Sequence, residues 1–199
     1  MPYKQRVRGS NPCAPTKKPS LDGFFYFTSM IRKILIALAI LFILIQFIRP
    51  AKNTSGVAPH PMSAKYQMTP DVETIFENSC YNCHSNKTDY PWYAEVQPVA
   101  WWLADHVKEG KQRLNFDDFT SRRIAFQNHK LEEIGEMVEE KKMPLPSYTW
   151  LGLHKEAKLT DEQRQVIIDW TVAQMDALKN QYPADSLIMP KRQGTPPSK

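Results

Sequence analysis

The hydrophobic pattern divides the chain into one continuous apolar run and a longer segment in which apolar residues recur at helical spacing. The run occupies residues 34–48, and Gln46 is its only polar member. As a helix it would be about 22 Å long, against a hydrocarbon core of about 30 Å. Because basic residues flank the run and can snorkel, we predict an uncleaved signal anchor, one membrane helix over residues 30–50. A cleaved signal peptide is the alternative, but no Ala-x-Ala-like site follows the run.

Downstream, apolar residues at i, i+3 and i+4 predict an all-α domain over residues 69–182. The expected helix boundaries are marked by capping and helix-breaking residues. Thr69 and Pro70 mark the start of a first helix, which leads into Cys80, and a second helix runs from Pro98 to Gly110. A third begins near Phe119, and a fourth has its apolar stripe from Leu131 to Val138. The last helix opens with a capping box at Thr160 and Gln163 and ends near Tyr182.

The remaining segments lack a period. Residues 1–29 and 183–199 are rich in Pro and Lys or Arg and are predicted to be disordered, and residues 51–68 read as a flexible tether. Starting at Met30 would place a short basic region directly before the apolar run, as in export signals. We therefore interpret residues 1–29 as the product of an upstream start choice.

The charge distribution favours a membrane protein over a binder of nucleic acid. The net charge is +5, yet residues 1–48 hold seven Lys or Arg and one acidic residue, so +6 lies there and −1 in the rest. Positive charge before an apolar run orients a membrane helix with its amino end in the cytoplasm. We expect a single-pass membrane protein with the domain outside the cytoplasm, and no nucleic-acid partner.

The candidate chemistry lies in Cys80-Tyr81-Asn82-Cys83-His84, because Cys-x-x-Cys-His is the attachment sequence of a c-type haem. The two thiols would add to the haem vinyl groups, and His84 would bind the iron as proximal ligand. One motif predicts one covalent haem c. The alternatives are a thiol redox pair, which calls for a βαβ pattern; a zinc site, which needs two more ligands; and a disulfide, which leaves His84 unexplained.

Met143 is the candidate sixth iron ligand. It lies 59 residues after His84 at a predicted helix end, and Pro144 and Pro146 stiffen the loop that follows. The competing interpretation is a methionine that only fills the core. A second Met-Pro pair, at Met189, has no helix after it. Four histidines are rival ligands: His106, His129, His154 and His60. Of these, His106 is the best placed, because it shares a helix face with Val99 and Trp102.

Six segments together resemble the bacterial haem-binding domain family of small membrane-anchored monohaem proteins. They are residues 80–85, 90–93 (Tyr-Pro-Trp-Tyr), 106–110, 114–116, 143–148 (Met-Pro-Leu-Pro-Ser-Tyr) and 154–159. The resemblance covers residues 30–182 and implies haem c, an N-terminal membrane segment and a helical domain outside the cytoplasm. The arrangement around Met143 also resembles class I cytochromes c, which implies a methionine opposite the histidine and a histidine oriented by a proline carbonyl, here Pro91.

Two functions fit these expectations. The first is a cytochrome c-like electron carrier with His84 and Met143 on the iron, exchanging electrons with redox partner proteins that the sequence does not identify. The second is a five-coordinate haem sensor or small haem enzyme that binds a gas or peroxide. No distal acid–base pair is evident in the sequence, so we expect a carrier and not an enzyme.

Overall fold

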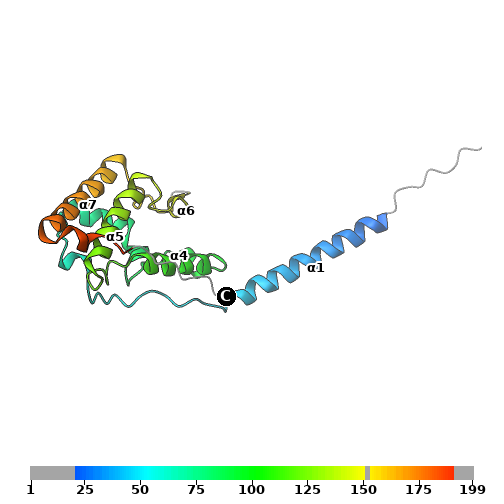
Figure 1. Ribbon diagram of the computed structural model, residues 1–199. Coiled ribbons are helices and arrows are strands. Elements are labelled where there is room, and N and C mark those ends of the chain that lie inside the picture. The colour runs from blue at the N-terminus through cyan, green and yellow to red at the C-terminus, as the bar shows by residue number, and fades with distance from the viewer. Residues whose placement is uncertain (1–20, 151–152, 191–199) are drawn as a thin grey trace, which may run out of the picture. The chain divides into compact units, whose positions relative to one another are not determined.

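The computed structural model describes residues 21–150 and 153–190, and in this part of the chain it is all-helical, as predicted. The chain forms two compact units, residues 1–48 and 49–199. The described part of the first unit contains helix α1 (Leu21–Ile45), and the second contains the remaining helices (Figure 1). They are η1 (Met62–Ala64), α2 (Pro70–Ser79), α3 (Tyr81–His84), η2 (Trp92–Glu95), α4 (Val99–Arg113), α5 (Ile124–Glu139), α6 (Pro146–Thr149), α7 (Asp161–Gln181) and η4 (Ala184–Leu187).

Helix α1 is long and apolar enough to cross a membrane over Tyr26–Ile45, a stretch of 20 residues whose apolar side chains are exposed. At 1.5 Å per residue this stretch spans about 30 Å, which matches a hydrocarbon core. The helix therefore begins earlier than the predicted anchor, and the expectation that residues 1–29 are without structure is wrong for residues 21–29. Residues 1–20, including Cys13, lie outside the described residues.

Several helix boundaries follow the capping residues named from the sequence. Thr69 caps α2 by accepting a hydrogen bond from the Val72 amide at 3.4 Å, and Pro70 is the first helical residue. The capping box of α7 is complete, because Thr160 and Gln163 each bond to the other's backbone amide. Such reciprocal bonds satisfy two of the amides that a helix start leaves unpaired.

Two of the predicted helix boundaries are wrong. Helix α4 continues through Gly110 to Arg113, and the expected third and fourth helices are one helix, α5, which begins at Ile124 and not near Phe119. Phe119 instead has 1% of its surface exposed and packs edge-on against Tyr66 with ring centroids 5.5 Å apart. Its burial comes from tertiary packing of a loop, which helical periodicity does not report.

The prediction that residues 51–68 form a flexible tether is also wrong. Met62 and Tyr66 are buried in the core, and the Met62 amide donates to the Phe116 carbonyl at 2.8 Å. The Tyr66 hydroxyl donates to Gln127 Oε1 at 2.7 Å. The folded unit begins at Arg49, since the segment is fixed by bonds to distant loops.

At the other end, the predicted disorder of residues 183–199 is wrong for the described part. Leu187, in η4, is buried in the same core, and its carbonyl accepts from Asn128 Nδ2 at 3.4 Å. Residues 191–199 lie outside the described residues.

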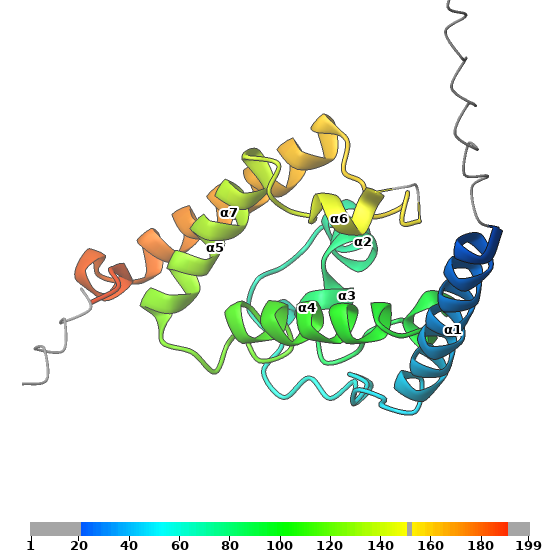
Figure 2. The same ribbon diagram turned by 90° about the vertical axis from the view of Figure 1, so that its right-hand side faces the viewer.

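The core of the second unit is aromatic at its centre. Phe76 of α2 is fully buried and makes edge-on contacts with Phe116 at 5.2 Å and with Trp170 of α7 at 5.3 Å between ring centroids. Helices α5 and α7 lie side by side in both views (Figures 1 and 2), and α2 joins them through Phe76. This cluster holds the C-terminal end of α2, and with it Cys80, against the rest of the domain.

Helices α3 and α4 touch backbone to backbone. A Cβ atom built on Gly110 would lie 2.7 Å from the Cys83 carbonyl oxygen, closer than real Cβ contacts allow. Gly110 is therefore needed in the interior of α4 because it lets this helix approach the Cys-x-x-Cys-His segment.

We predict that Gly110→Ala destabilises the domain. The added methyl group would displace α3 or α4, and overpacking of this kind costs about 1–3 kcal/mol, more than the roughly 1 kcal/mol that Ala gains over Gly in a helix. Urea denaturation of the haem-loaded protein, followed by circular dichroism, should show a lower midpoint.

Gly135→Ala is the matched control for this substitution. A Cβ there would meet the hydroxyl of Thr171 at 2.9 Å, which is a side-chain atom and not part of the backbone of a crossing helix. Its midpoint should fall less than that of Gly110→Ala. Equal or greater stability of Gly110→Ala relative to the wild type would contradict the close approach.

Candidate haem site

Cys80, Cys83 and His84 lie on one turn of backbone. The Cys80 amide donates to the Phe76 carbonyl at 2.9 Å as α2 ends, and the Cys80 carbonyl accepts from the amides of Cys83 at 3.2 Å and His84 at 3.1 Å. The two thiols and the imidazole are each partly exposed. The structure therefore brings the three predicted residues together on one turn of backbone.

The His84 ring is oriented by a backbone carbonyl. Its Nδ1 lies 3.0 Å from the carbonyl oxygen of Leu114, the residue that caps the C-terminus of α4. With Nδ1–H donating to that oxygen, Nε2 is the nitrogen left for a metal. The ring also packs edge-on against Phe116 at 5.9 Å between centroids, which restricts its rotation.

The carbonyl that orients His84 is not the one expected from the class I cytochromes. The Pro91 carbonyl instead accepts from the Ala94 amide at 3.0 Å, inside η2. Leu114 orients His84 through its backbone carbonyl, which every residue type has, so the sequence could not identify it as the partner of His84. Burial lowers the pKa of His84, opposed by its bond to Leu114, and favours the neutral imidazole that binds metals.

The two thiols are free, and their environment disfavours a thiol redox pair. Burial raises the pKa of Cys80 to about 12, with a further contribution from Cys83, and burial also raises the pKa of Cys83. Nucleophilic cysteines in Cys-x-x-Cys redox motifs have lowered pKa values. A zinc site also lacks support, because no group of three or more His, Cys, Asp or Glu side chains that could hold a metal occurs in the described residues.

The backbone of Met143 is held by two other elements. Its amide donates to the Met137 carbonyl at 3.0 Å, and its carbonyl accepts from Arg164 Nη1 of α7 at 3.0 Å. The same Arg164 nitrogen donates to the Val138 carbonyl at 2.8 Å, so α7 ties the end of α5 to the Met143 loop. The Met143 side chain is partly exposed.

The segment that follows Met143 reaches the motif itself. Tyr148 of α6 accepts a hydrogen bond from Asn82 Nδ2 at 3.3 Å, and Asn82 lies between the two cysteines. In Figure 2 α4 lies beside α3, and the two helices are in contact. The loop that carries Met143 and the turn that carries His84 are therefore neighbours in the fold.

Of the rival ligands, His154 is buried in a polar cluster that occupies both of its ring nitrogens. Its Nε2 makes a short hydrogen bond with the Tyr93 hydroxyl, and its Nδ1 lies 3.1 Å from Glu156 Oε1. Tyr148 stacks on its ring at 4.0 Å between centroids, with the planes 11° apart. A nitrogen of His154 could bind iron only after one of these bonds had broken.

The other histidines differ in how their nitrogens are used. His106 Nδ1 lies 2.8 Å from the Trp102 carbonyl one turn earlier in α4, which leaves Nε2 available, so His106 remains an alternative ligand. His129 Nδ1 is 3.6 Å from the Glu132 carboxylate on the surface of α5. His60 is exposed and takes part through its backbone in bonds to Asp117 and Phe119.

Haem is the group that the motif implies, and the residues present fit it. Two free thiols lie three residues apart beside an imidazole whose Nδ1 faces the Leu114 carbonyl. The elements next to α3 also expose large apolar side chains of the kind that a porphyrin would cover. They are Val99 and Trp102 on α4, and Trp150 and Leu153 after α6.

Comparison with known proteins agrees with this geometry. The model of the haem-binding domain family matches residues 40–173, which include the motif, α4, α5 and most of α7. No curated protein and no solved structure matches the chain. Because the family model covers more than half of the sequence, the chain belongs to the haem-binding domain family.

Proposed function

We propose that the protein is a membrane-anchored monohaem c-type cytochrome that transfers electrons. The observation that carries the proposal is the orientation of His84, whose Nδ1 is committed to the Leu114 carbonyl beside two free thiols on the same turn. When bound, the haem supplies a one-electron ferric/ferrous couple. The protein's own residues hold it, orient it and limit what reaches the iron.

Cys80 and Cys83 would hold the haem through two thioether bonds, and His84 would be the proximal ligand. The hydrogen bond from His84 Nδ1–H to Leu114 keeps the ring in one tautomer and increases the basicity of Nε2. A side chain at position 110 would press on the Cys83 carbonyl, so glycine there lets the motif lie close to α4, whose end carries Leu114.

Met143 would be the sixth ligand. The bond from Arg164 to its carbonyl and the bond from its amide to the Met137 carbonyl hold its backbone, and the Asn82–Tyr148 bond keeps the loop beside the motif. A loop whose backbone is already ordered loses little further entropy when its thioether closes on a metal.

We further propose that α1 anchors the protein in the bacterial inner membrane as a single span. The positive residues before the apolar segment favour a cytoplasmic amino end and a periplasmic haem domain. Redox partner proteins would then exchange electrons with the haem outside the cytoplasm, where thioether attachment of haem c takes place.

Covalent attachment predicts that haem stays with the polypeptide in denaturing electrophoresis and gives peroxidase staining. Cys80→Ala and Cys83→Ala should each weaken the stain, and the double substitution should remove it, because no thioether bond remains. Cys13→Ala is the control and should keep full staining. A double variant that stains like the wild type would exclude thioether attachment.

Ligation by Met143 predicts that the ferrous wild type takes up carbon monoxide poorly. Met143→Ala should bind it readily, lose the weak red charge-transfer band of ferric methionine-ligated haem, and have a lower reduction potential. Since axial ligands change haem potentials over about 0.8 V, we expect a shift of roughly 0.1 V or more.

Met189→Ala, which removes the other Met-Pro pair, should behave like the wild type in all three measurements. If the wild type lacks the band yet excludes carbon monoxide, and His106→Ala opens the iron, His106 is the sixth ligand. A wild type that lacks the band and binds carbon monoxide freely would favour the sensor.

The proposed orientation predicts that a reporter active only after export, fused after Lys52, is active in cells. A second reporter, active only in the cytoplasm, should be inactive at the same position. The reverse result would show that the haem domain faces the cytoplasm.

A further inference from the structure

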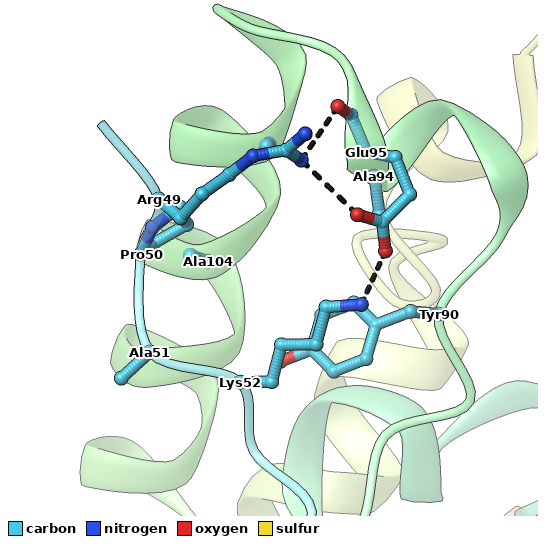
Figure 3. A pocket seen from close by; sticks show the side chains of 9 residues that line it. Arg49, Pro50, Ala51, Lys52, Tyr90, Ala94, Glu95 and Ala104 are labelled. Carbon is cyan, nitrogen blue, oxygen red and sulfur yellow. Dashed lines mark hydrogen bonds and ion pairs between the residues drawn. The ribbon is translucent and has the colours of Figure 1, made fainter. Parts of the chain in front are cut away.

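The five residues that follow Ile48 form a strut, residues 49–53, fixed to the haem domain. Arg49 Nη1 donates to the Glu95 carbonyl at 2.7 Å and to Glu95 Oε2 at 3.0 Å, and Lys52 Nζ bonds to the other carboxylate oxygen of Glu95 (Figure 3). The Lys52 ammonium also lies over the Tyr90 ring, 5.4 Å from its centroid. One carboxylate thus holds both basic residues of the strut.

Asn53 attaches the end of the strut close to the haem-binding motif. Its amide donates to the Tyr90 hydroxyl at 2.8 Å, and its side-chain nitrogen donates to the Ser85 carbonyl at 2.9 Å, one residue after His84. Its side-chain oxygen accepts from Lys111 Nζ of α4 at 2.6 Å. The strut is therefore bonded at both ends, and its path over the domain is set.

A groove runs between the strut and α4. It has a volume of about 580 Å³, is open to solvent, and is lined by Lys52, Lys108 and Lys111, with Asp105 as its one acidic residue and Trp101 as its aromatic residue. Because Lys52 is already paired with Glu95, the positive charges of the lining that remain for a ligand are those of Lys108 and Lys111, with Asp105 beside them. Lys108 makes no ion pair with any of the residues that the structure describes, so its ammonium is available to a ligand.

The position of the groove along the chain indicates what would occupy it. Arg49 comes four residues after Ile45, the last residue of the candidate membrane span. Four residues extend at most about 14 Å. The headgroup layer occupies about 5–8 Å on each side of the hydrocarbon core, so the strut can begin within or just beyond it.

We propose that this groove binds the phosphate-bearing headgroup of an anionic phospholipid from the bilayer that holds α1. The lysines supply the charge for the phosphate, and Trp101 is a residue type suited to the membrane interface. The inference rests on the membrane anchoring in the proposed function, and it assigns the domain a lipid site separate from the haem.

The test uses the full-length, haem-loaded protein in detergent. Native mass spectrometry of the protein mixed with equimolar phosphatidylglycerol and phosphatidylcholine should show retained phosphatidylglycerol in excess. A lysine near a membrane surface contributes about 1 kcal/mol to the attraction of anionic lipid, so Lys108→Gln should reduce retention roughly fivefold. Lys87→Gln is the matched control, because Lys87 is an exposed lysine outside the groove that approaches Asp89 at 3.9 Å.

Equal retention of the two lipids, or equal effects of Lys108→Gln and Lys87→Gln, would overturn the lipid site. Competition by glycerol phosphate as strong as by phosphatidylglycerol would instead identify a site for free phosphate. Haem staining and flotation with liposomes are measured on the same samples. A protein that stains and floats but does not retain phosphatidylglycerol disproves the lipid site and leaves the proposed cytochrome intact.

Discussion

The contact between the Cys83 carbonyl and Gly110 determines the geometry of the haem site. Because α4 passes so close to α3, the residue that caps its C-terminus, Leu114, comes within hydrogen-bond distance of His84, and that bond would leave Nε2 for an iron. Any side chain at position 110 would separate the two helices and lengthen the bond. Fold and ligand orientation therefore depend on the same helix crossing.

The sequence predicted those features that depend on neighbouring residues. The Cys80–His84 motif and the caps at Thr69 and Thr160 are local patterns, and the structure contains all three. Met62 and Tyr66 were assigned to a tether because they have no period, yet they are buried by contacts with loops far along the chain. Long-range burial of irregular segments leaves no periodic signal in the sequence.

The histidines, too, differ in properties that depend on long-range contacts and not on the local sequence. From the sequence alone, four of them competed with Met143 for the iron, since residue type and spacing do not reveal what a ring nitrogen contacts. The structure separates them by their hydrogen bonds: His154 uses both nitrogens, and His106 uses one. Gly110 likewise predicts a helix end from the sequence, whereas it lies inside α4. Its role depends on the close approach of α3, which is far from it in the sequence.

The strut has a consequence for how a membrane-anchored carrier would meet its partners. A haem domain on a long flexible linker explores a volume around its anchor, whereas here the residues from Arg49 onward already belong to the folded domain, which leaves few residues to act as a linker. Encounters would then depend on two-dimensional diffusion of the whole protein in the plane of the bilayer. Turnover would change with the surface density of the partners and with the viscosity of the membrane, more than with the length of the polypeptide between anchor and haem.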